Sequence, residues 1–77
     1  MTDEQKIALI LYQVRNELVK AMAKHGPMRS RHEGYAILKE EFDEFWDEIK
    51  RNDGQKAREE VLQIGAMAVR YLLDIKD

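Results

Sequence analysis

The sequence contains no cysteine, which excludes both disulfide bonds and thiolate metal sites. Any metal ion that the chain binds must therefore be held by oxygen atoms or by imidazole nitrogen. Proline and glycine are also scarce, with one and four residues respectively in a chain of 77. This scarcity favours long helices, because proline breaks a helix and glycine destabilises one.

Long apolar runs are absent as well. No segment approaches the roughly 20 apolar residues that are needed to span a bilayer. The apolar segment at residues 7–11 is too short for a signal peptide and lacks the expected flanks. We therefore expect a cytoplasmic protein with no membrane partner. The 15 acidic residues outnumber the 13 lysines and arginines, giving a net charge of −2. No nucleic-acid polymer is expected as a partner, since the only basic connection, at residues 28–33, is a weak signal for one.

Three helical segments account for the chain, which we interpret as a single domain spanning residues 1–77. Apolar residues recur at steps of three and four, which predicts helices at about residues 3–25, 31–51 and 55–75. Thr2 and Ser30 each precede a glutamine or glutamate by three positions, which is the spacing of a capping box. Gly26 is expected to take the left-handed conformation that often follows a helix.

The third helix has apolar residues on two opposite faces. One face carries Val61, Ile64, Ala68, Leu72 and Ile75, and the other carries Leu62, Ala66, Val69 and Leu73. A helix that is apolar on most sides is buried on most sides, and two other helices cannot cover it completely. Because a chain this short also has a small core, we expect an all-α protein whose three-helix protomer forms a helical bundle by homo-oligomerisation.

The second helix concentrates acidic residues, namely Glu40, Glu41, Asp43, Glu44, Asp47 and Glu48. Helical geometry places Glu41, Glu44 and Glu48 along one flank of an apolar stripe centred near Phe45, and turns the other acids toward solvent. In an antiparallel hairpin, Glu41 and Glu44 can face Glu60 and Gln63 of the third helix. Such an oxygen-only cluster suits Mg²⁺ or Mn²⁺. Alternatively, the acids form a solvated face and Glu60 pairs with an arginine or lysine.

Two motifs resemble those of a known family. Residues 40–44 (EEFDE) fit the pattern EExxE, and residues 60–63 (EVLQ) nearly fit ExxD. Together with the longer stretches at residues 32–50 and 57–74, they resemble the MazG-like nucleoside triphosphate pyrophosphohydrolases of the all-α superfamily. This resemblance implies a dimeric or tetrameric helical bundle. It also implies magnesium-dependent hydrolysis of a nucleoside triphosphate, or a related nucleotide, to a monophosphate and pyrophosphate.

The resemblance also implies roles for individual residues. Glu41, Glu44 and Glu60 match acids that hold magnesium, and Glu40 is the adjacent acid. Because a carboxylate that is not fully engaged by metal can act as a general base, Glu40 and Glu41 are the candidate catalytic residues. Gln63 departs from the motif: its amide oxygen can bind a metal ion, but it brings no charge. The alternative function is therefore a non-catalytic helical oligomer or nucleotide-binding module that has lost activity through Gln63.

Four further residues are candidates for contacts with the substrate. Arg29, Arg31 and Lys56 could reach phosphate oxygens, and Trp46 could stack on a nucleobase. Each also has an ordinary structural interpretation. The two arginines could belong to a solvated loop, Lys56 could pair with acids of the second helix, and Trp46 could pack against apolar neighbours.

Overall fold

Three α-helices and two short connections make up the computed structural model, which describes residues 1–77. The helices are α1 (Asp3–Lys24), α2 (Arg31–Lys50) and α3 (Gly54–Asp74). The all-α prediction is confirmed, and each helix begins and ends within one residue of the expected position. None of the three helices has the length and apolarity that a membrane crossing requires.

The first two helices begin at the predicted caps. Thr2 Oγ1 accepts a hydrogen bond from the Gln5 backbone N–H at 3.2 Å, and the Gln5 side chain accepts one from the Thr2 N–H at 2.8 Å, so the first capping box is complete. Ser30 caps α2 by accepting from the Glu33 N–H at 3.1 Å. The Glu33 carboxylate pairs instead with Arg29 at 3.5 Å, so Ser30 acts through its hydroxyl alone.

The connections between helices differ from the prediction at Gly26. α1 ends at His25 in an extended conformation with φ of −131°, and no glycine has a positive φ. The prediction of a left-handed Gly26 is therefore wrong. Proline disfavours helical backbone in the residue before it, so Pro27 allows the chain to leave α1 without a left-handed turn. The left-handed residue is Asn52, with φ of 58°, in the turn between α2 and α3.

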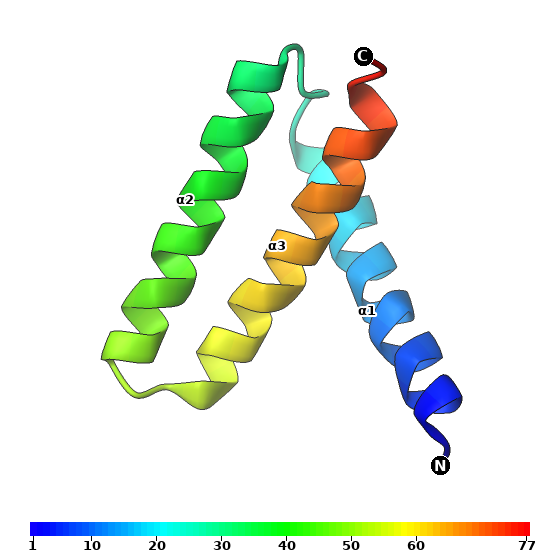
Figure 1. Ribbon diagram of the computed structural model, residues 1–77, viewed down its shortest axis with the longest axis vertical. Helices are drawn as coiled ribbons and strands as arrows, with labels where there is room; N and C mark the ends of the chain where they lie inside the picture. Colours follow the sequence, from blue (N-terminus) through cyan, green and yellow to red (C-terminus); the bar gives the residue numbers. More distant parts are fainter.

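α3 is the central helix of the protein (Figure 1). α2 runs antiparallel to α3, α1 crosses α3, and α1 and α2 do not pack against each other. Two glycines mark the places where helices approach closely. A Cβ atom on Gly34 would lie 2.4 Å from the Tyr71 ring, and one on Gly65 would lie 3.3 Å from Val14. The α2–α3 hairpin thus depends on the missing side chain at Gly34.

The side of α2 that packs against α3 includes only part of its apolar stripe, since Leu38 and Phe45 are half-buried. Gly34 and Glu48 are buried and Glu41 is half-buried, and their seven-residue spacing places them on one line along the helix. Phe42 and Trp46 are instead 53% and 58% exposed. The contact at Gly34 sets the rotation of α2, so the acid-bearing flank faces α3 and much of the apolar stripe faces outward.

Few apolar side chains are buried in this arrangement. The buried apolar residues are Leu18, Met28, Ala57 and Ala66, and no large side chain is completely buried. All three helices keep large apolar side chains at the surface. In α1, every residue before Val14 is exposed, and the large apolar ones in that half are Ile7, Leu9, Ile10, Leu11 and Tyr12. The three helices therefore leave extensive apolar surface uncovered.

Candidate metal centre

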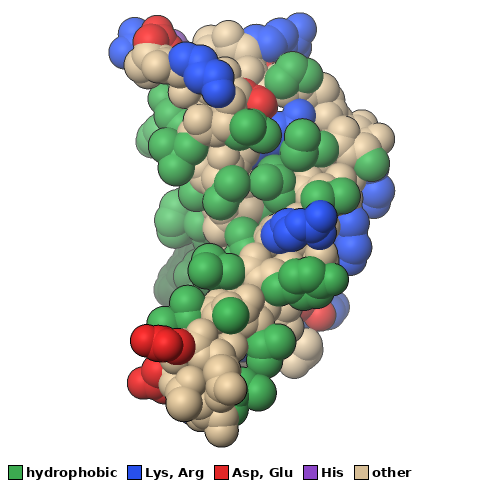
Figure 2. All heavy atoms as spheres, turned by 90° about the vertical axis from the view of Figure 1, so that its right-hand side faces the viewer, with side chains coloured by type: hydrophobic (Ala, Val, Ile, Leu, Met, Phe, Trp, Pro, Cys, Tyr) green, Lys and Arg blue, Asp and Glu red, His purple; other side chains and the backbone are tan.

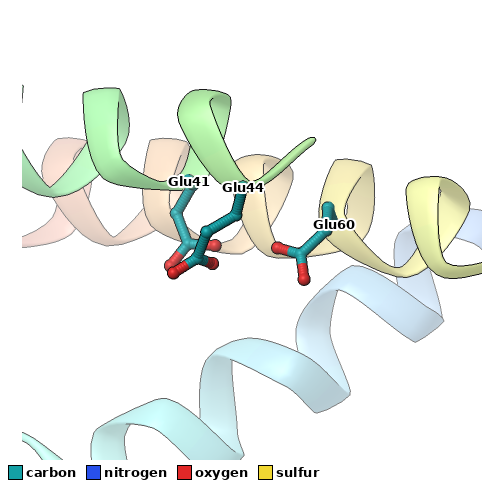
Figure 3. A group of neighbouring side chains, drawn as sticks. All are labelled: Glu41, Glu44 and Glu60. Atoms are coloured by element: carbon teal, nitrogen blue, oxygen red, sulfur yellow. The ribbon is translucent and has the colours of Figure 1, made fainter. Parts of the chain in front are cut away.

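Three glutamates meet where α2 faces α3. Glu41 and Glu44 stand about one turn apart on α2, Glu60 comes from α3, and one carboxylate oxygen of each lies within 4.8 Å of the others. Figure 3 shows Glu41 and Glu44 projecting side by side from α2, with Glu60 projecting toward them from α3. The antiparallel packing of α2 and α3 brings them together.

The cluster carries negative charge without compensation. Oε2 of Glu41 and Oε2 of Glu60 are buried and have no hydrogen-bond partner. Burial, and then the charges of Glu44 and Glu60, raise the pKa of Glu41 from its usual 4.5 to about 7. Burial and the charge of Glu44 also raise the pKa of Glu60. Carboxylates in such surroundings are stabilised by a proton or by a cation.

No basic side chain neutralises this cluster. The ion pairs in the structure involve neither Glu41 nor Glu44 nor Glu60. The alternative interpretation, in which Glu60 pairs with an arginine or lysine, is therefore wrong. The oxygen-only donor set fits a hard cation such as Mg²⁺ or Mn²⁺. Glu41, Glu44 and Glu60 are the residues that would hold such an ion, because one carboxylate oxygen of each lies within 4.8 Å of the others.

Gln63, one turn beyond Glu60 on α3, forms a hydrogen bond with a side chain of α1. Its Nε2 donates a hydrogen bond to Oε2 of Glu17 at 2.5 Å. A carboxylate only accepts hydrogen bonds, so Glu17 orients the nitrogen of the amide toward α1 and the oxygen away from it. Sequence reasoning missed Glu17, because no motif distinguishes it from the other acids of α1.

A cavity of about 590 Å³ opens beside the cluster. It lies between the end of α1, the α1–α2 connection, α2 and α3, and both Glu40 and Glu41 line it. Arg29, one of the predicted substrate contacts, lines the same cavity, as does Arg70. Acids that could serve a metal ion and one arginine, Arg29, that could serve an anion thus line the same concave site.

The structure does not place the other three predicted substrate contacts in this cavity. Arg31 borders a separate shallow depression on the surface. Trp46 lies on the outward side of α2, and the Lys50 ammonium lies over its ring, 5.9 Å from the centroid. Lys56 is exposed in the first turn of α3. Arg29 is therefore the one member of this set that lines the cavity next to Glu41.

A buried ion pair holds one wall of the cavity. Arg70 Nε donates to Asp74 Oδ2 at 2.9 Å, and the same oxygen accepts from the Met28 backbone N–H at 2.9 Å. Arg70 also donates to the His25 carbonyl at 3.3 Å. The bond from Arg70, followed by the bond from Met28, lowers the pKa of Asp74. An arginine on an apolar helix, with an acid four residues later, is the sequence signal that could have revealed this pair.

No family model, curated protein or solved structure matches this chain. The likeness of residues 40–44 and 60–63 to the MazG-like motifs accordingly stays a hypothesis.

Proposed function

We propose that this chain is a small MazG-like enzyme that uses Mg²⁺ to hydrolyse a nucleoside triphosphate to a monophosphate and pyrophosphate. The observation that carries the proposal is the convergence of Glu41, Glu44 and Glu60 within 4.8 Å. Two buried carboxylate oxygens there lack any partner, which is unfavourable unless a cation or proton completes the site. The spacing of the two sequence motifs supports the same assignment.

Different residues around the cluster would bind the metal ion, bind the phosphate groups and accept a proton. Magnesium held by Glu41, Glu44 and Glu60 would supply charge neutralisation for the phosphate oxygens. Arg29 can donate two parallel hydrogen bonds to a phosphate group in the adjoining cavity. Glu40 lines this cavity, is exposed, and stands outside the three converging carboxylates. It is therefore placed to accept a proton from the attacking water, with Glu41 as the other candidate base.

A non-catalytic helical oligomer or nucleotide-binding module is the alternative function, and Gln63 favours it. The third helix supplies one carboxylate, Glu60, while the Gln63 amide donates to Glu17. The chain keeps four of the five acids that the EExxE and ExxD motifs provide together, so a site held by Glu41, Glu44 and Glu60 can still bind a divalent cation. Such a protein would bind magnesium and nucleotide without useful turnover.

The uncovered apolar surface favours assembly with a second copy of the chain. The half of α1 before Val14 projects without packing against the rest of the protomer, and an isolated helical segment of this length is marginal in water. Figure 2 shows hydrophobic side chains over much of the face on which α1 lies. We propose a homodimer or tetramer in which another copy covers this face. Sedimentation equilibrium that gives a folded monomer at micromolar concentration would contradict it.

The test of the function is a pyrophosphate-release assay over canonical and common modified nucleoside triphosphates, with and without magnesium. Magnesium-dependent release is expected from the unaltered protein and not from Glu41→Gln. The matched control is Asp43→Asn, which removes an exposed acid of α2 that pairs with Lys39 at 3.2 Å and should retain activity. No release from any substrate by a folded protein that still binds Mn²⁺ would favour the non-catalytic alternative.

A further inference from the structure

Glu48 is a buried residue in which only one of the two carboxylate oxygens has a hydrogen-bond partner. It lies on α2 one turn beyond Glu44 and is 7% exposed. Its Oε1 accepts a hydrogen bond from the Arg51 guanidinium, but its Oε2 is buried and has no partner. The Arg51 side chain is itself 68% exposed, so it reaches the carboxylate from the surface side. A buried, unpartnered carboxylate oxygen is costly.

The position of Glu48 connects it with the acid cluster. Glu41 and Glu48 are seven residues apart on the flank of α2 that faces α3, and Glu48 follows Glu44 by one turn. The three buried carboxylate oxygens without a partner in this protein belong to Glu41, Glu48 and Glu60. All three residues lie on α2 and α3, the helices that carry the candidate metal centre.

We propose that Glu48 is a fourth cation-binding residue of this site, with its Oε2 accepting a hydrogen bond from a water molecule that hydrates the bound divalent cation. Glu48 does not belong to the group of oxygens within 4.8 Å of one another, so the proposed contact with the cation runs through water and is not direct. Magnesium usually keeps several of its waters, and these waters need acceptors. The inference rests on the proposed metal site and adds a positioning residue that neither sequence motif contains.

The test is the affinity for Mn²⁺ alone, measured by electron paramagnetic resonance of the free ion. Removing an outer-shell partner typically weakens metal binding by about 10- to 100-fold, and Glu48→Gln should fall in that range. Arg51→Gln leaves the carboxylate in place and frees Oε1, so it should bind Mn²⁺ at least as tightly as the unaltered protein. Asp43→Asn, the exposed control, should change the affinity less than about threefold, because long-range charge effects are screened by salt.

The outcomes separate this inference from the proposed function. If Glu48 serves only the ion pair with Arg51, Glu48→Gln will bind Mn²⁺ as the unaltered protein does, or both variants will weaken binding equally, and the inference is then wrong. If the unaltered protein binds no Mn²⁺, the proposed function fails and this inference fails with it. Should Glu48→Gln not fold, Glu48→Asp keeps the charge but withdraws the carboxylate, and unchanged affinity in that variant also overturns the inference.

Discussion

Replacing Glu41 with glutamine should stabilise the metal-free protein, although it removes a candidate metal ligand. In the folded protein, burial and the charges of Glu44 and Glu60 raise the pKa of Glu41 from 4.5 to about 7. Below about pH 4.5 the carboxyl group is protonated in both the folded and the unfolded chain. Between those two pKa values the folded protein binds more protons than the unfolded chain does, so its stability falls as the pH rises.

The size of the effect follows from this difference in pKa. A pKa raised from 4.5 to about 7 corresponds to an upper limit of about 3 kcal/mol, at about 1.4 kcal/mol per pH unit. Glu41 is only half-buried, so solvent screens part of this energy. We expect Glu41→Gln to raise the free energy of unfolding by about 1–2 kcal/mol at pH 8. The difference should shrink toward zero at pH 4.5, where the native carboxyl group is already neutral.

The assay is urea unfolding followed by circular dichroism, in a chelator, at both pH values and one fixed protein concentration. The fixed concentration matters because an oligomer gains apparent stability by mass action. Magnesium at about 100 times its dissociation constant should then stabilise the unaltered protein by about 2.7 kcal/mol and Glu41→Gln much less. A variant that is no more stable than the unaltered protein at pH 8 would refute the reasoning, because burial and like-charge repulsion would then not destabilise the charged Glu41 carboxylate.

Three further predictions concern contacts between the helices. Gly34→Ala should lower the melting temperature, because the added Cβ would lie 2.4 Å from the Tyr71 ring, and overpacking costs about 1–3 kcal/mol. Asp74→Asn should loosen the α1–α2 connection, seen as faster amide exchange there, and the unaltered protein should lose this stabilisation as the pH falls through the lowered pKa of Asp74. Gln63→Asp alone should destabilise the protein, since it would place a second carboxylate next to that of Glu17. Adding Glu17→Gln should restore the stability. Equal stability of the single and double variants would contradict this prediction.

Local sequence signals predicted the helices and their starts. Thr2 and Ser30 bond to backbone N–H groups three residues away, so their capping role depends on the neighbouring chain alone. The step of three and four residues likewise predicted the three helices, because it reflects the repeat of a single helix. The acid-bearing flank of α2 was also predictable, since it follows from the angular spacing of residues along one helix.

Local sequence signals could not predict how far α2 is rotated about its own axis when it packs against α3. Hydrophobic periodicity predicted an apolar stripe on α2 centred near Phe45. The close fit of Gly34 against Tyr71 instead brings the neighbouring flank, which carries Glu41 and Glu48, against α3. Such a fit depends on the shapes of two surfaces that are distant in sequence. The left-handed Gly26 was a wrong prediction for a different, local reason, because Pro27 lets Gly26 follow α1 without a positive φ.

The sequence by itself thus determined the three helices, the chemical nature of the acid cluster and the motif residues within it. Only the tertiary structure decided which partners these residues have. The bonds of Gln63 with Glu17 and of Met28 with Asp74 each join residues 46 positions apart, and the unpartnered oxygen of Glu48 is buried only because α2 lies against α3. Contacts of this kind depend on how helices cross and rotate against one another, and packing in three dimensions fixes that geometry.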